Sequence, residues 1–279
     1  MRKLNSRKYG FTLFEDELEE ILNTASSLGV NHIEINFPQR LSPNDAFDNN
    51  RAKNIIKLAE SANIKLSFHL PYSVSISDII PGIRKAGINF LKKSIEAAGK
   101  INAAHITIHM GTFYWFPAAK WMRKKALDRF IKNIIPILEI CEAHNVIIAL
   151  ENVAPIPHGS DYYYLGDNVH DFKYIFDNIN SEYLAFCFDA GHANLGEGVR
   201  TYIDELGHKI VTVHFHDNDS TNDDHRAVGD GTINWNDVIK GLIKINYTGP
   251  LITECRDKIK YESIQILEKK FLDYLDKNE

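Results

Sequence analysis

Eight short apolar runs alternate with helix-like segments along almost the whole chain, and this alternation limits the fold more than any other feature of the sequence. In the first helix-like segment, residues 15–29, apolar residues such as Leu18, Leu22 and Ala25 recur at helical spacing, and Gly29 is a candidate C-cap. Further helices are expected at 51–62, 82–101, 118–144, 169–178, 199–206, 235–245 and 261–275. The apolar runs, expected as strands, are 8–14, 31–37, 64–70, 104–110, 146–152, 183–189, 209–216 and 250–255.

The strands are apolar throughout, which is typical of parallel strands whose two faces are both covered. Eight strand–helix units in 279 residues, close to the usual length of about 250, predict an α/β fold with a single (β/α)8 TIM barrel. A doubly wound open sheet is the alternative, but no GxGxxG follows the first strand and no GxxxxGK[ST] occurs. No linker or change of composition divides the chain, so residues 1–279 are expected to form one domain. Asn234 is a plausible N-cap for the helix at 235–245.

Composition narrows the class of protein. The formal charge of -5 and the lack of a long basic run do not favour nucleic acid as a partner, although a local basic groove is compatible with them. Cys141, Cys187 and Cys255 are odd in number and include no CxxC, which indicates a reducing compartment. No apolar stretch approaches the roughly 20 residues that span a bilayer, and the basic start lacks the apolar region of a secretory signal. We therefore expect a soluble cytoplasmic protein without membrane partners.

Polar side chains gather at the predicted carboxyl ends of the strands, where barrel enzymes keep their chemistry. The stretch VTVHFHDND (211–219) shows this most clearly, because a buried strand ends in two histidines and two aspartates. A carboxylate inside a barrel mouth is costly unless it is paired or bound to metal. His32 and His105 lie near strand starts and are expected to be structural. The strand-end groups are Glu34, Asn36, His69, His109, Glu151, Asp189, His214, His216 and Glu254.

Two further pairs lie in loops. Asp189 and His192 are three residues apart after the sixth strand, and Asp223 and His225 form a D-x-H whose side chains would point the same way if the loop were extended. Imidazole and carboxylate ligands without cysteine suit Zn, Mn, Co or Fe(II). The pattern indicates a site for metal or proton transfer.

Together these segments resemble the xylose isomerase-like barrels, a superfamily that includes endonuclease IV and many sugar isomerases and epimerases. The resemblance covers nearly the whole chain and is specific for the superfamily rather than for a substrate. The motifs that carry it are FHLPY (68–72), ITIHMG (106–111), ALENV (149–153), FDAGHAN (188–194), VHFHDND (213–219), the D-x-H at 223–225, GDGTINW (229–235) and TEC (253–255).

The resemblance to the ketose epimerase-like branch implies a single divalent ion held by Glu151, Asp189, one histidine of the seventh strand and Glu254. It implies that Glu151 and Glu254 are also the catalytic pair, one removing a proton next to the carbonyl and the other returning it. His214 is the expected strand-seven ligand and His216 its rival. The residues expected to contact substrate are His192, His216, Arg256 and Tyr72.

The resemblance to the endonuclease IV branch implies three zinc ions instead. His69, His109 and Glu151 would hold one of them. Glu151, Asp189, His214 and Glu254 would hold the second, and His192, Asp223 and His225 the third. Tyr72 matches a tyrosine that contacts DNA in that branch. However, HMGTFYWF and ENVAPIPHG do not look like the endonuclease segments, and FPQRLSPND lacks the basic and aromatic residues that grip a duplex.

From these patterns we expect a divalent-metal-dependent isomerase or epimerase that acts on a sugar, sugar phosphate or related polyol through an enediolate. Zn or Mn is the expected metal, with one to three ions per chain. The partner is a small carbohydrate, and an oligomer is compatible with the sequence. The alternative is an endonuclease IV-like zinc enzyme that acts on abasic sites in nucleic acid. A binding protein without turnover is the third possibility, which the intact glutamate pair argues against.

Overall fold

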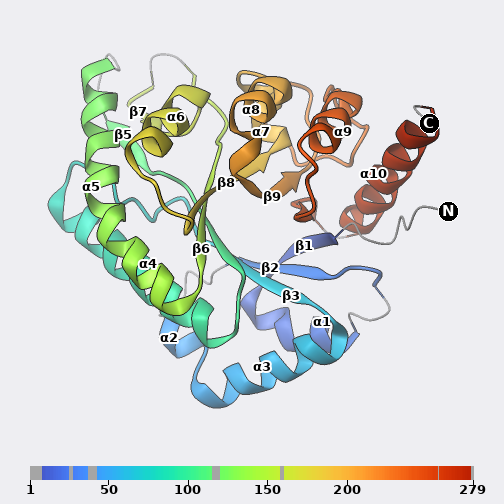
Figure 1. Cartoon of the computed structure of the whole chain (residues 1–279), viewed down its shortest axis with the longest axis horizontal. Coiled ribbons are helices and arrows are strands. Elements are labelled where there is room, and N and C mark those ends of the chain that lie inside the picture. Colours follow the sequence, from blue (N-terminus) through green and yellow to red (C-terminus); the bar gives the residue numbers. More distant parts are fainter. Residues whose placement is uncertain are drawn as a thin grey trace.

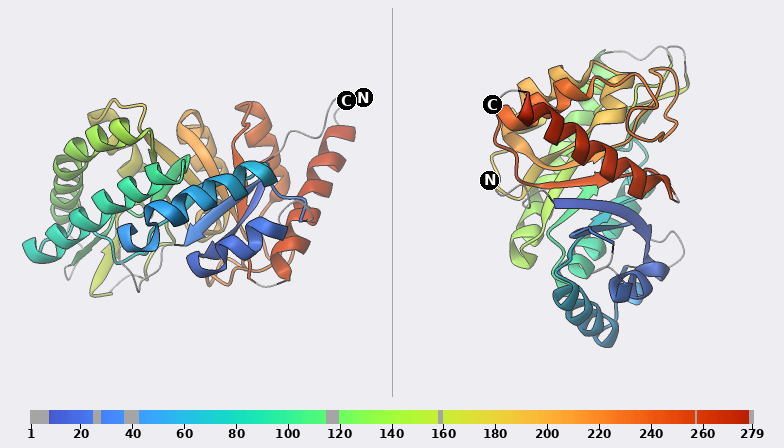
Figure 2. Two further views of the ribbon diagram at one scale, coloured as in Figure 1. Left: turned by 90° about the horizontal axis from the view of Figure 1, so that it is seen from below. Right: turned by 90° about the vertical axis from the view of Figure 1, so that its right-hand side faces the viewer.

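The computed structural model of the protein describes residues 8–24, 28–36, 43–114, 120–157, 160–256 and 258–277. Eight parallel strands form a closed barrel in the order β1-β10-β9-β8-β6-β4-β3-β2. The last strand lies beside the first, as Figure 2 shows, so the open-sheet alternative is wrong and the predicted barrel is confirmed. The strands are β1 (Lys8–Phe14), β2 (His32–Asn36), β3 (Lys65–His69), β4 (His105–Ile108), β6 (Ile147–Glu151), β8 (Leu184–Asp189), β9 (Ile210–Phe215) and β10 (Pro250–Thr253).

Helices surround the barrel, with α3, α4 and α5 on one side of the strands and α8, α9 and α10 on another (Figure 1). Two of them have the predicted bounds, α6 (Val169–Asn178) and α8 (Val199–Leu206). The first helix begins later than predicted, because residues 15–17 form a 3-10 turn. Residues 25–27 of the predicted helix lie outside the described residues. The other helices are α1 (Leu18–Thr24), α2 (Pro43–Ala46), α3 (Asn49–Ala62), α4 (Pro81–Lys100), α5 (Lys120–His144), α7 (Ala190–Leu195), α9 (Trp235–Lys244) and α10 (Ile259–Asp276).

Side chains at the helix starts explain some of these bounds. The Asp48 carboxylate accepts hydrogen bonds from the backbone N–H groups of Asn50 and Arg51, and so caps α3. Asn168 caps α6 in the same way. Asn234 does precede α9, as predicted, but its side chain makes no capping bond and instead donates to Asp237. Within the described residues, no helix has the length and apolar character needed to cross a membrane.

A two-stranded antiparallel sheet stands apart from the barrel. It pairs β5 (Thr112–Tyr114) with β7 (Tyr162–Tyr164). Strands of three residues are too short to show a periodicity, so the sequence does not predict them. Three aromatic residues follow the fourth predicted strand, namely Tyr114, Trp115 and Phe116, and the sequence leaves a pocket wall, a lid and an interface open as their role. Their side chains lie outside the part of the chain whose side chains are described.

Candidate metal centre

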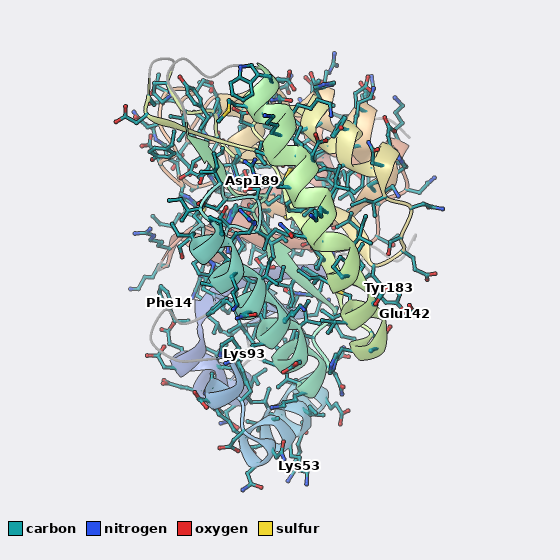
Figure 3. All side chains as sticks on the ribbon, turned by 90° about the vertical axis from the view of Figure 1, so that its left-hand side faces the viewer. Phe14, Lys53, Lys93, Glu142, Tyr183 and Asp189 are labelled. Atoms are coloured by element: carbon teal, nitrogen blue, oxygen red, sulfur yellow. The ribbon has the colours of Figure 1, made fainter. Side chains whose placement is uncertain are left out.

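The strand-end carboxylates and imidazoles face one another at the carboxyl ends of the barrel strands. The register places Asp189 of β8 level with His214 of β9, and Glu151 of β6 level with Cys187 of β8. In Figure 3, Lys53, Lys93 and Glu142 lie on the outer helices, whereas Asp189 lies among the strands. All nine candidate metal ligands belong to groups of side chains whose ligand atoms converge, and the described residues therefore include several clusters that could hold a metal ion.

Glu151 lies at the centre of an inner cluster, made of Glu151, His69, His109, His214 and Glu254. Its Oε2 is 3.0 Å from His69 Nε2 and 2.9 Å from His109 Nε2. Its Oε1 is 3.0 Å from His214 Nδ1, and that nitrogen is also 3.3 Å from Glu254 Oε1. The two glutamates predicted to act together therefore meet at one imidazole nitrogen. Because His214 makes both contacts, the geometry favours it over His216 as the ligand between them.

Asp223 lies at the centre of an outer cluster, made of Asp189, His192, His216, Asp223 and His225. Its Oδ2 is 3.2 Å from His192 Nε2 and 3.3 Å from His225 Nε2. His216 stacks on the His225 ring with 4.1 Å between centroids, and its Nε2 is 3.3 Å from Asp189 Oδ1. His192 links the clusters, since its Nδ1 lies 3.7 Å from Glu151 Oε1 and 3.5 Å from Asp189 Oδ1.

The charges of the inner cluster depend on one another. Burial opposes ionisation of Glu151, but the neighbouring His214 and His69 cations outweigh it and hold its pKa well below the usual range. Burial likewise opposes ionisation of Glu254, whose side chain is 12% exposed, but the His214 cation lowers its pKa to about 2. Burial alone would lower the pKa of His214, yet the surrounding acidic groups raise it well above the usual range. Protons on the imidazoles thus balance the carboxylates, a role that a divalent cation would also fill.

Several buried polar atoms support a fit to metal, because they lack a hydrogen-bond partner within the described residues. They include Oδ2 of Asp189, Nδ1 of His225 and both ring nitrogens of His109 and His216. Buried polar groups are rarely left unsatisfied in folded proteins. Lone pairs that point at a common centre rather than at each other are expected of metal ligands, and imidazole with carboxylate is a donor set suited to zinc or manganese.

Asn152 orients the outer cluster, a role that the sequence did not reveal. Its backbone carbonyl accepts a 2.8 Å hydrogen bond from His192 Nδ1, which leaves Nε2 facing Asp223. Its side chain exchanges two hydrogen bonds with the Asp189 backbone, at 2.8 and 2.9 Å. Supporting groups of this kind fix the ring and tautomer of a ligating histidine. The position of Asn152 directly after Glu151 is the only signal in the sequence.

The two aspartates of VTVHFHDND do not join the histidines at the mouth, contrary to the prediction. Asp217 is fully buried and accepts hydrogen bonds from Gly229 N and Trp235 Nε1, both at 2.8 Å, and from Ile233 N at 3.2 Å. Asp219 pairs with Arg226 away from the clusters. Asp217 therefore anchors the loop that carries Asp223 and His225, because its carboxylate binds backbone groups on the far side of that loop.

Asp223 and His225 do meet, but through a turn rather than the extended backbone on which the prediction depended. The φ angle of His225 is 50°, in the left-handed region, and this turn brings its ring toward Asp223. Tyr72 stacks on His109 with 3.5 Å between ring centroids, so it lies against the inner cluster. Arg256 is exposed beyond β10, and among the described residues it makes no hydrogen bond or ion pair with either cluster.

Not every residue predicted at the barrel mouth lies there, because some lie deeper in the barrel. Asn36 is level with His69, but Glu34 is level with Ser67, one layer below, and is fully buried. The rings of His32 and His105 stack still deeper, with 5.5 Å between their centroids. The Cys187 thiol lies beside Glu151 and His214, and burial raises its pKa well above the usual range.

Residues 22–272 match the model of a single family, described as xylose isomerase-like TIM barrel. The chain belongs to this family. Its membership agrees with the barrel and with the strand-end positions of the clusters.

The proteins that this chain resembles carry different functional names. The uncharacterized protein MJ1614 of Methanocaldococcus jannaschii is 30% identical over 68% of this chain and 71% of its own length. A probable endonuclease 4 of Mesoplasma florum is 30% identical over 62% of this chain and 60% of its own length. Among solved structures, a D-tagatose 3-epimerase-like protein superposes with a TM-score of 0.82 at 23% identity, covering 97% of this chain and 99% of that one. The likeness to this structure shows the shared fold.

Proposed function

We propose that this family member is a divalent-metal-dependent isomerase or epimerase of a sugar or related polyol. The observation that carries the proposal is the meeting of Glu151 and Glu254 at His214 Nδ1, 3.0 and 3.3 Å away. Two ionised carboxylates at one point of the mouth are what proton transfer to and from a carbon acid needs, whereas binding alone needs neither. The similarity of the fold to a D-tagatose 3-epimerase-like protein supports the same choice.

Glu151, Asp189, His214 and Glu254 would hold the principal cation. When bound, it draws electron density from the carbonyl and adjacent hydroxyl oxygens of the substrate. One glutamate takes the proton from the carbon next to the carbonyl, and the electron pair of the broken C–H bond moves into an enediolate. The other glutamate returns a proton to carbon, so that the reaction is a net isomerisation without oxidation or reduction. The pKa of each carboxylate lies below its usual range, so either glutamate is available in ionised form as the base. The glutamate that acts as the acid enters the step carrying a proton taken up from water, and the base leaves it as the carboxylic acid and returns its proton to water.

Aromatic groups beside the inner cluster suit a carbohydrate. Tyr72 covers His109, and Tyr164 of the β5–β7 sheet lies 5.2 Å from Tyr72 between ring centroids. Aromatic faces pack against the apolar face of a sugar ring while polar groups at the rim bind hydroxyls. His192 and His216 in the outer cluster, and the exposed Arg256, are the further candidates for contact with hydroxyls or a phosphate.

Hydrogen exchange tests this proposal without knowledge of the product. Metal-loaded protein is incubated in D₂O with a panel of ketoses and keto-polyols, and deuterium at the carbon next to the carbonyl is followed by NMR. At least one compound is expected to exchange. Glu151→Gln and Glu254→Gln should each slow the exchange by about 10²–10⁴-fold. Glu205→Gln, the same change in a surface ion pair with Lys173, should leave the rate unchanged. Equal rates in all four proteins would refute the assignment.

One observation favours a zinc-dependent nuclease as the second candidate. The clusters bring together all the residues that the endonuclease IV resemblance implies, including His69, His109, Asp223 and His225. The similarity to a probable endonuclease 4 of Mesoplasma florum points the same way. Nucleic acid would be the partner only under this reading.

A further inference from the structure

A buried column of polar side chains runs beneath the inner cluster. His32 Nε2 is 2.9 Å from Ser67 Oγ, and that hydroxyl donates a 3.1 Å hydrogen bond to Glu34 Oε2. Glu34 is fully buried. An ionised carboxylate in a barrel interior is costly unless neighbouring groups compensate it, so its partners indicate its role.

The column ends at His214, whose two ring nitrogens face carboxylates in opposite directions. Nδ1 faces Glu151 and Glu254 at the mouth, whereas Nε2 is 2.8 Å from Glu34 Oε1. Nε2 and Oε1 are both buried, and neither makes a hydrogen bond to another group of the described residues. A neutral imidazole has one N–H and one lone pair, and a metal ligand must offer the lone pair.

Other hydrogen bonds fix the Glu34 carboxylate in this direction. Its Oε2 accepts from Ser67 Oγ and, at 3.2 Å, from Thr107 Oγ1, while His105 Nε2 lies 3.5 Å away. Both hydroxyls donate their hydrogen bonds to the same carboxylate oxygen, Oε2. Oε1 is thereby left to His214, and the carboxylate cannot turn without losing two buried hydrogen bonds.

We propose that Glu34 is a positioning residue for the metal centre. Its Oε1 accepts the Nε2 proton of His214, which leaves the Nδ1 lone pair facing the cation between Glu151 and Glu254. A carboxylate behind a ligating histidine fixes the ring and makes it a stronger ligand, and its loss typically weakens metal affinity by about 10–100-fold. This inference rests on the metal centre proposed above, but not on the reaction.

Zinc titration against a competing chelator tests the inference in the absence of any sugar. Glu34→Gln removes the charge and is expected to weaken the tightest zinc site by about 10–100-fold without changing the number of ions bound at saturation. In zinc-loaded wild type, ¹⁵N NMR of the His214 ring should place the proton on Nε2, and the variant should shift this signal. Asp171→Asn, a matched change in a buried acid that pairs with Arg123, should lower the melting temperature but leave zinc affinity unchanged.

Thr107→Val serves if Glu34→Gln does not fold, because it removes one hydrogen bond to Glu34 and keeps the carboxylate. A loss of zinc affinity of a few fold is expected. The proposal would be overturned if Glu34→Gln and Thr107→Val each bound zinc with an affinity within twofold of that of wild type. So would the loss of a whole ion at saturating zinc, since Glu34 would then be a ligand itself. A protein that fails to exchange ketose protons but shows the predicted zinc affinities would refute the proposed reaction and leave the role of Glu34 standing.

Discussion

The imidazole of His216 occupies the space that a side chain on Gly191 would fill. A Cβ atom at position 191 would overlap the ring at its Cε1, Nε2 and Nδ1 atoms. The outer cluster therefore depends on a glycine at the start of α7. We expect Gly191→Ala to destabilise the protein by about 1–3 kcal/mol and to reduce zinc binding by the outer cluster, because His216 must move.

Gly82 provides the control for this change. It lies in α4, and no atom is within 4 Å of the position that its Cβ would take. Gly82→Ala should leave the denaturation midpoint equal or slightly higher, since alanine loses less conformational freedom in a helix. Midpoints that match between Gly191→Ala and wild type would show that the ring is free to move.

Asp217→Asn tests the anchoring of the loop after β9. The carboxylate accepts from four N–H groups, three of the backbone and one of the Trp235 indole, and hydrogen bonds to charged groups are worth about 1.5–3 kcal/mol each. We expect a lower melting temperature and faster proteolysis between residues 219 and 232. Asp219→Asn, on the exposed side of the same loop, should have a much smaller effect. If both variants melt alike, Asp217 is not the anchor.

His32 predicts a specific pH dependence of stability. Burial, helped by the nearby His105, lowers its pKa from 6.5 to about 3. The unfolded chain therefore takes up a proton below pH 6.5 that the folded chain does not, and stability falls as pH drops from 6.5 toward 3. His32→Gln removes this effect. The stability difference between wild type and variant should be about 2 kcal/mol smaller at pH 5 than at pH 7.5, as measured by urea unfolding. A difference independent of pH would show that folding leaves the pKa of His32 unchanged.

The number of zinc ions per chain tests whether the outer cluster binds metal as well as the inner one. We expect two or three zinc ions per chain after loading, because five imidazoles outside the central ligand set, those of His69, His109, His192, His216 and His225, converge on carboxylates. Mass spectrometry during graded EDTA treatment should show the ion between Glu151 and Glu254 leaving last. A ratio that never exceeds one would assign His69, His109 and His225 to substrate or structure.

The barrel could be predicted because parallel strands covered on both faces are apolar throughout, so each run is visible in the sequence. The strand-end histidines and acids could be predicted as well, since the fold fixes which end of each strand carries chemistry. How deep each of these residues lies within the barrel could not be predicted from the sequence. Glu34 and Asn36 differ by two residues and share a face, and only the register with Ser67 and His69 shows that Glu34 lies one layer below the mouth.

Long-range hydrogen bonds account for the other differences. Asp217 and His216 are neighbours in the sequence, yet Trp235 and Gly229 fix Asp217 away from the mouth. Asn152 acts through a carbonyl, a group that every residue has. Such roles depend on distant partners that the local sequence does not identify.

The most direct test of the central claim offers both candidate substrates to one preparation of the protein, loaded with zinc or manganese. A ketose panel is incubated in D₂O, and a duplex with a single abasic site is incubated separately, each with and without chelator. If Glu151 and Glu254 transfer protons to and from carbon, we expect metal-dependent deuterium exchange next to the carbonyl of at least one ketose. We expect no useful incision of the duplex. Efficient incision beside the abasic site, abolished by chelation, with no exchange into any ketose would contradict it.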